Sequence, residues 1–135
     1  MSYLLKPVDK LTRDECDKID VVCIGHFNVL HPGHFRFINF AANRGSTLCV
    51  ILKDDDEFEP SERHHYFAAQ DRADILYNVP NVKHIIIKGS KTLEQCLEVI
   101  RPTFFVLGHE FERQRPQEIS ILIDKADDLG IEVIF

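Results

Sequence analysis

The stretch GHFNVLHPGH (25–34) concentrates residues whose side chains can act on phosphate groups. His31 and His34 lie three residues apart, so on a helix both imidazoles would project toward the same side. Gly33 has no Cβ, which leaves room for a phosphate to approach the backbone closely. Two imidazoles around one anion could stabilise the negative charge that develops on a phosphorus atom. The alternative interpretation is a strained loop with a buried structural histidine.

The residues on either side predict how this stretch is held. The apolar run DVVCIG (20–25) is typical of a strand buried on both faces of a parallel sheet. A helix is predicted over 31–45, with Pro32 in its first turn and Gly45 just past its end. The stretch is then the first strand-to-helix turn of a doubly wound sheet. Such sheets bind ligands outside the carboxyl ends of their strands, where a helix N-terminus offers N–H groups to an anion.

Strands and helices alternate along the rest of the chain. Further strands are predicted over 46–53, 82–88, 103–108 and 131–135, and helices over 63–78, 91–101 and 116–129. Thr12 and Glu15 fit a capping box, which predicts a short helix near 12–18. The pattern predicts an α/β, Rossmann-like fold with a doubly wound, five-stranded parallel sheet in the order 3-2-1-4-5. We expect an N-terminal lead-in over 1–18 and one domain over 19–135.

Composition excludes several classes of function. The chain has 135 residues and a net charge of −6, and it has no long basic block, so a nucleic-acid polymer is not an expected partner. No apolar run approaches the roughly 20 residues that span a bilayer, and the charged N-terminus is unlike a signal peptide. Cys23 and Cys49 lie in apolar runs and no CxxC pair occurs, which predicts buried thiols in a reducing, cytoplasmic compartment.

The quoted stretch resembles the first motif of the nucleotidyltransferase superfamily, G-[TC]-F-D-x-x-H-x-G-H. This superfamily includes glycerol-3-phosphate cytidylyltransferases, heptose-phosphate adenylyltransferases and archaeal-type FAD synthetases. Weaker similarities extend the resemblance over most of the chain. They are DEF (56–58) after the second strand, QDR (70–72) in the second helix, and IRPTFFVLGHEFE (100–112) around the fourth strand.

The resemblance implies the transfer of CMP or AMP from ATP or CTP to a phosphorylated sugar or polyol, with release of pyrophosphate. Mg²⁺ would neutralise part of the triphosphate, and no metal site made of side chains is expected. His31 and His34 would be the catalytic residues, and Arg72 would contact phosphate. The nucleotide-binding residues implied are Gly25, His26, Phe27, Asn28, Gly33, Arg72, Gly108, His109 and Glu110. A homodimer is also considered.

Three residues depart from the family's pattern. His26 stands in place of Thr or Cys, as a third phosphate ligand or as a bulky edge residue. Asn28 stands in place of Asp and keeps an acceptor without the charge, whereas His109 stands where relatives often have Gly or Asp. These departures leave open the alternative function of a nucleotide-binding module that does not catalyse.

The family normally continues past the fifth strand into a serine-rich segment that holds the β- and γ-phosphates. The sequence ends at Phe135, so we expect this C-terminal phosphate-binding segment to be absent. The ending resembles domains fused ahead of a sugar kinase, which leaves open the N-terminal part of a larger bifunctional protein.

Overall fold

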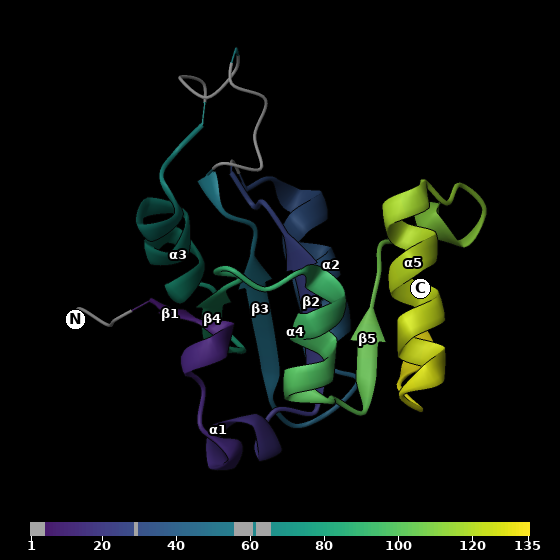
Figure 1. Ribbon diagram of the computed structural model, residues 1–135. Coiled ribbons are helices and arrows are strands. Elements are labelled where there is room, and N and C mark those ends of the chain that lie inside the picture. Colours follow the sequence, from purple (N-terminus) through teal and green to yellow (C-terminus); the bar gives the residue numbers. More distant parts are fainter. Residues whose placement is uncertain (1–4, 29, 56–60, 62–65) are drawn as a thin grey trace.

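The computed structural model describes residues 5–28, 30–55, 61 and 66–135. Within these residues, six parallel strands form one sheet in the order β1-β4-β3-β2-β5-β6 (Figure 1). The strands are β1 (Lys6–Pro7), β2 (Val21–Gly25), β3 (Leu48–Leu52), β4 (Val82–Ile87), β5 (Phe104–Val106) and β6 (Glu132–Ile134). Parallel pairing places all their carboxyl ends along one edge of the sheet, and the first motif follows β2 at that edge.

The sheet has one strand more than the sequence predicted. The prediction of five strands was wrong because β1 adds to the edge of β4, where Lys6 pairs with Ile86 and Pro7 with Ile87. A two-residue strand is too short to show hydrophobic alternation, and Pro7, which has no N–H, suits an edge position. The other five strands lie in the predicted order, β4-β3-β2-β5-β6.

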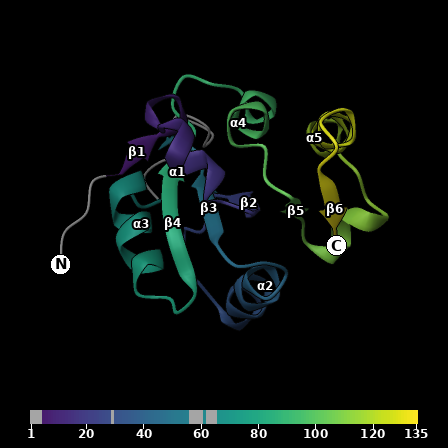
Figure 2. The same cartoon turned by 90° about the horizontal axis from the view of Figure 1, so that it is seen from below.

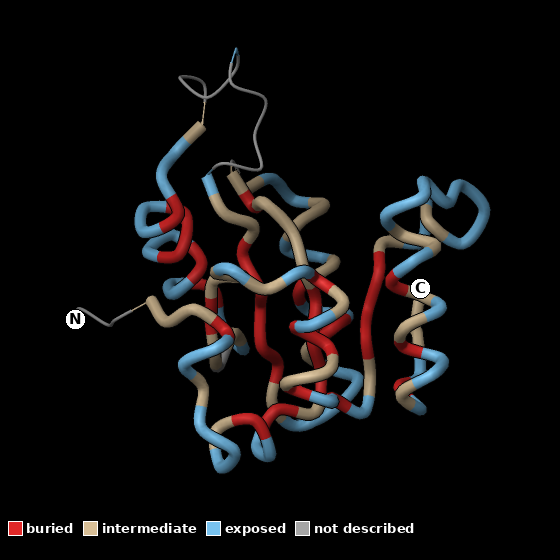
Figure 3. The backbone as a smooth tube through the Cα atoms, in the orientation of Figure 1, coloured by how far each residue is buried: buried red, intermediate tan, exposed pale blue. Residues whose placement is uncertain are grey.

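Helices cover both faces of the sheet (Figure 2). They are α1 (Arg13–Asp17), α2 (Pro32–Ala42), α3 (Ala69–Tyr77), α4 (Leu93–Ile100) and α5 (Gln117–Asp128), with 3-10 turns η1 (Val8–Lys10) and η4 (His109–Glu112). Side chains from α2 and α3 pack with one face of the strands, and side chains from α1, α4 and α5 pack with the other. The central strands β2 and β3 are therefore almost entirely buried (Figure 3).

The sequence located several helix ends correctly. The capping box at α1 is present, because the Thr12 hydroxyl accepts from the N–H of Glu15 at 3.1 Å and the Glu15 carboxylate accepts from the N–H of Thr12 at 2.9 Å. Thr92 caps α4 in the same way. Gly130 follows α5 with φ 73°, a left-handed backbone that glycine adopts without a steric penalty.

The prediction that α2 extends to residue 45 was wrong. The helix ends at Ala42, and Gly45 does not have the left-handed backbone of a helix cap. The carboxylate of Asp20 instead accepts from the N–H groups of Ser46 and Thr47, both at 2.7 Å. These two hydrogen bonds tie the residues just before β3 to Asp20, the residue directly before β2.

The remaining predictions concern the cysteines, a membrane-spanning helix and three segments that lie outside the described residues. All four cysteines are free and buried, as predicted for Cys23 and Cys49. Within the described ranges, no helix combines the length and the hydrophobicity that crossing a membrane requires. Val29 of the first motif, the DEF segment (56–58) and residues 63–65 of the helix predicted over 63–78 lie outside the described residues.

Candidate active site

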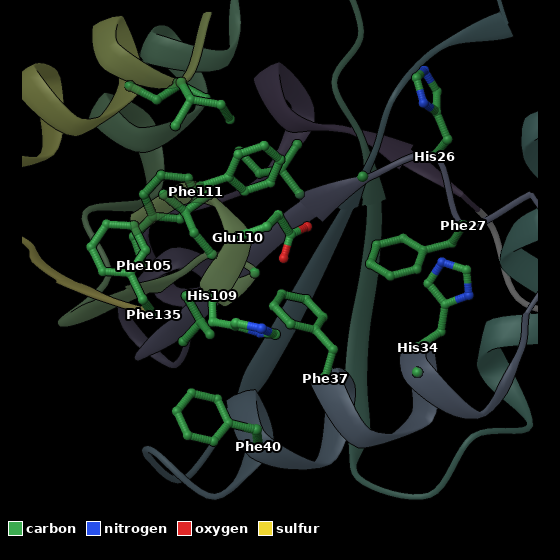
Figure 4. Close-up of a pocket in the computed structure, with 18 of the residues that line it drawn as sticks. His26, Phe27, His34, Phe37, Phe40, Phe105, His109, Glu110, Phe111 and Phe135 are labelled. Atoms are coloured by element: carbon green, nitrogen blue, oxygen red, sulfur yellow. The ribbon is translucent and has the colours of Figure 1, made fainter. Parts of the chain in front are cut away.

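A pocket of about 910 Å³ opens at the carboxyl ends of β2, β3 and β5 (Figure 4). Its walls are formed by the first turns of α2, by the segment from β5 into η4, and by the start of α5. The predicted site residues that line it are Gly25, His26, Phe27, His31, Gly33, His34, Gly108, His109 and Glu110. The fold therefore brings together two segments that are more than seventy residues apart in the sequence.

His31 and His34 form a reciprocal cap at the N-terminus of α2. Nδ1 of His31 accepts from the N–H of Gly33 at 3.0 Å, and Nδ1 of His34 accepts from the N–H of His31 at 3.2 Å. A neutral imidazole carries one proton, so an accepting Nδ1 leaves that proton on Nε2. With ring centroids 3.9 Å apart, the two imidazoles offer neighbouring Nε2–H donors. The backbone of α2 thus selects the tautomer that can donate to phosphate oxygens.

The surroundings of His34 keep its imidazole neutral. Burial and the nearby ring of His31 lower the pKa of His34. Its ring also meets the edge of Phe27, at 5.7 Å between centroids. Near neutral pH this histidine is therefore suited to donate one hydrogen bond from Nε2, as opposed to supplying a positive charge.

Two glycines make room for side chains of the pocket. A Cβ on Gly33 would lie 2.7 Å from Cε1 of His31, so the imidazole occupies the space that was predicted for a phosphate. A Cβ on Gly108 would clash with the carboxylate of Glu110. Figure 4 shows that carboxylate near the middle of the pocket. These glycines thus position an imidazole and a carboxylate, and direct contact with a nucleotide stays a prediction.

Arg72 is fully buried and lies outside the pocket lining. Its guanidinium donates to the carbonyl oxygens of Phe67, His26 and Lys53 at 2.9, 2.8 and 2.9 Å. It also forms an ion pair of 2.8 Å with Asp55. In this structure Arg72 holds together the segments that follow β2 and β3 and the segment that precedes α3. The predicted phosphate contact stays a prediction, and the observed role is positional.

Asn28 also contributes to this arrangement from outside the pocket lining. Its Oδ1 accepts from the N–H of Phe67 at 2.7 Å, while the carbonyl oxygen of Phe67 accepts from Arg72. Between Asn28 and the anchored His26, Phe27 has φ 49°, which is uncommon for a residue with a bulky side chain. The amide therefore supplies a hydrogen-bond acceptor that orients the turn, a role that does not require the charge of Asp.

His26 lies at the edge of the pocket with a strongly shifted pKa. Burial, followed by the positive charges of Lys53 and Arg72, lowers the pKa of His26 to about 4. Figure 4 shows its ring directed away from Phe27 and His34. His26 is therefore neutral at pH 7, and its ring does not join the other two imidazoles.

Sequence reasoning missed one whole wall of the pocket. Five phenylalanines line it: Phe37, Phe40, Phe105, Phe111 and Phe135. The spacing of Phe37 and Phe40 on α2, three residues apart, was a signal that both face one side. The wall gives the pocket an apolar, aromatic part next to its polar histidine end. Among the described residues, no three His, Cys, Asp or Glu side chains gather as ligands for a metal ion.

Comparison with known proteins agrees with this geometry. A family model described as cytidylyltransferase-like matches residues 22–133. The FAD synthase of Pyrococcus abyssi is 29% identical over 119 residues, which are 86% of this chain and 77% of that protein. The FAD synthase of Methanosarcina acetivorans is 29% identical over 105 residues, which are 78% of this chain and 64% of that protein.

Two solved structures share the fold. A lipopolysaccharide core biosynthesis protein from Thermoplasma volcanium has a TM-score of 0.65 at 23% identity, with 86% of this chain and 92% of that chain covered. A pantothenate synthetase from Thermus thermophilus has a TM-score of 0.66 at 15% identity, with 96% and 59% covered. At these identities the likeness concerns the fold alone. The family match spans the first motif, the histidine cap and the turn after β5, and the chain belongs to the cytidylyltransferase-like family.

Proposed function

We propose that the protein is a nucleotidyltransferase that transfers AMP or CMP from a nucleoside triphosphate to a phosphorylated sugar or polyol. The observation that carries this proposal is the reciprocal cap of His31 and His34. It leaves two Nε2–H donors beside the N-terminus of α2, in a pocket large enough for a nucleotide. Membership in the cytidylyltransferase-like family supports the same chemistry.

The proposed reaction is a displacement at phosphorus. A phosphate oxygen of the acceptor forms a bond to the α-phosphorus, and the bond from that phosphorus to the bridging oxygen of the β-phosphate breaks. The bonding electrons leave with pyrophosphate. The imidazole donors and the positive end of the α2 dipole stabilise the charge that grows on the α-phosphate oxygens. A phosphate monoester with a second pKa of about 6 is already ionised at pH 7, so no general base is needed.

A Mg²⁺ bound with the triphosphate would neutralise part of its negative charge. Magnesium sites of this kind use phosphate oxygens and water, with only one or two carboxylates from the protein. The carboxylates that line the pocket are Glu110 and Glu118 among the described residues, and Glu118 is already paired with Lys53. Glu110 is therefore the residue that fits a phosphate-bound Mg²⁺, directly or through water.

The relatives indicate which acceptor should be tested first. They are FAD synthases, and FAD joins AMP to riboflavin 5′-phosphate through a pyrophosphate bond. The phosphate of riboflavin 5′-phosphate lies on a ribityl chain, which is a polyol. The aromatic wall of the pocket suits a planar ring, whether that of a nucleobase or of a flavin. ATP with riboflavin 5′-phosphate is thus the first substrate pair within the proposed class.

Pyrophosphate release tests the proposal directly. ATP and CTP are each incubated with Mg²⁺ and riboflavin 5′-phosphate, glycerol 3-phosphate or a sugar phosphate, and pyrophosphate is measured over time. We expect release with at least one pair and its loss in a His34→Gln variant. Nucleotide binding by calorimetry without release from any pair would favour a binding module that does not catalyse. The absence of both binding and release would refute the proposed site.

A further inference from the structure

An ion pair crosses the pocket between two elements that are not neighbours in the sheet. Lys53 directly follows β3, and Glu118 lies in the first turn of α5, with 3.0 Å between Nζ and Oε1. Strands β2 and β5 lie between β3 and β6, the strand that α5 contacts. Both residues line the same pocket as His31 and His34. The pair therefore spans the crevice in which the proposed ligand would lie.

The backbone of Lys53 is fixed on both sides. Its N–H donates to the carbonyl oxygen of Gly25 at 3.0 Å, and its own carbonyl oxygen accepts from Arg72 at 2.9 Å. The side chain of Lys53 is 19% exposed, whereas that of Glu118 is 52% exposed. The cation is thus the anchored, more enclosed partner of the pair, and the carboxylate is the partner that can turn outward into water.

The pocket has little other permanent positive charge. Among the described residues that line it, only Lys53 and Arg36 carry a permanent positive charge, and Arg36 is exposed on α2. His34 and His26 have lowered pKa values and are neutral near pH 7. A polyphosphate carries several negative charges, and it gains most from a cation that is already held inside the pocket.

We propose that Lys53 binds the β- and γ-phosphates of the nucleoside triphosphate, and the leaving pyrophosphate, and that Glu118 is the counter-ion it exchanges for them. The inference rests on the proposed function of the same pocket. A single carboxylate is readily displaced by a polyphosphate but not by a weakly charged ligand. Glu118 therefore sets the selectivity of the site for highly charged phosphates and makes nucleotide binding weaker than Lys53 alone would allow.

Inorganic pyrophosphate is the probe, with its affinity measured by calorimetry. Glu118→Gln removes the competing carboxylate, and we expect about threefold to fivefold tighter binding, the range of an ion pair that is partly exposed. Glu112→Gln is the matched control, because it changes the net charge by the same amount. Glu112 is exposed and lies on η4, outside the pocket lining. Equal tightening in both variants would attribute the effect to net charge and overturn the role of Glu118.

Variants of Lys53 test the other half of the exchange. Lys53→Met keeps most of the aliphatic stem, and we expect pyrophosphate binding to weaken by about tenfold or more. The charge swap Lys53→Glu with Glu118→Lys keeps an ion pair and the net charge, so thermal unfolding should stay near that of the wild type. Pyrophosphate should nevertheless bind to the swap as weakly as to Lys53→Met. Wild-type affinity in either protein would overturn the role of Lys53.

The design separates this inference from the proposed function. A wild-type protein that binds pyrophosphate, with variants that behave as described, supports the exchange even where no substrate pair releases pyrophosphate. Nucleotide transfer with unchanged pyrophosphate affinity in Lys53→Met would overturn the exchange and leave the proposed function standing. A wild-type protein that binds no pyrophosphate would overturn the exchange, whereas the proposed function would still be decided by pyrophosphate release from the substrate pairs.

Discussion

The guanidinium of Arg72 donates a 2.8 Å hydrogen bond from Nη1 to the carbonyl oxygen of His26, the residue directly before the left-handed backbone of Phe27. Arg72 lies on α3, which contacts β4, and β3 lies between β4 and β2, the strand that this turn follows. Its other partners are the carbonyl oxygens of Phe67 and Lys53 and the carboxylate of Asp55. One buried cation thus fixes the segment that leads into the histidine cap and the segment that carries Lys53.

Replacement of Arg72 should destabilise the fold and the site together. Arg72→Leu leaves three carbonyl oxygens without this donor, so we expect the free energy of unfolding to fall by about 3 kcal/mol or more. Arg72→Lys should also lower the free energy of unfolding, because an ammonium cannot reproduce the planar fork of donors of the guanidinium. Urea denaturation measures both. Arg113→Leu at an exposed position is the control, with an expected change within about 0.5 kcal/mol. Unchanged stability in Arg72→Leu would refute this role.

The histidine cap allows catalysis to be separated from capping. Asn at position 31 and Gln at position 34 keep acceptors that suit an N-cap and a capping box, but they lack the imidazole Nε2–H. We expect His31→Asn and His34→Gln to keep stability within about 1 kcal/mol. The rate of nucleotide transfer should fall by about 10²–10³ with a smaller change in nucleotide affinity. The two quantities are measured as kcat and as the midpoint of thermal unfolding. A loss of stability in proportion to the loss of rate would contradict this prediction.

The sequence located the turn between β2 and α2 because its signals are local. An apolar run ends at Gly25, and Pro32 suits the first turn of a helix, so both neighbours of the motif could be assigned from residues close to it. The capping role of His31 was not predicted, because the usual N-cap residues are Ser, Thr, Asp and Asn. The position of Arg72 was not predictable either, since its acceptors come from three segments that only the folded sheet brings together.

Gly33→Ala should affect activity more than stability. A Cβ at this position would lie 2.7 Å from Cε1 of His31, so the imidazole must move and its hydrogen bond to the helix is strained. The loss of that cap is opposed by the better helix propensity of Ala, which favours it over Gly by about 1 kcal/mol. We expect the free energy of unfolding to change by less than about 1 kcal/mol while the transfer rate falls at least about tenfold. Transfer kinetics and urea denaturation of the same preparation test this, and a wild-type rate would show that the ring of His31 is not required where it lies.

The depressed pKa of His26 predicts how stability depends on pH. Burial, Lys53 and Arg72 lower its pKa to about 4 in the folded protein, whereas an unfolded histidine titrates near its ordinary pKa of 6.5. Between these two values the unfolded chain binds the proton and the folded chain does not, so stability contributed by the neutral ring is present above pH 6.5 and is lost as the pH falls toward 4. His34 and His84, whose pKa values are also lowered, add to the same trend.

His26→Thr, which introduces a residue typical of the family's first motif, isolates the part that belongs to His26. This variant has no titrating group at position 26, so its urea midpoint should fall less steeply than that of the wild type between pH 7 and pH 4. The difference between the two proteins should be constant above pH 7, where His26 is neutral in both the folded and the unfolded state. Parallel curves over the whole range would mean that His26 titrates alike in both states, and that burial, together with Lys53 and Arg72, does not hold its ring neutral.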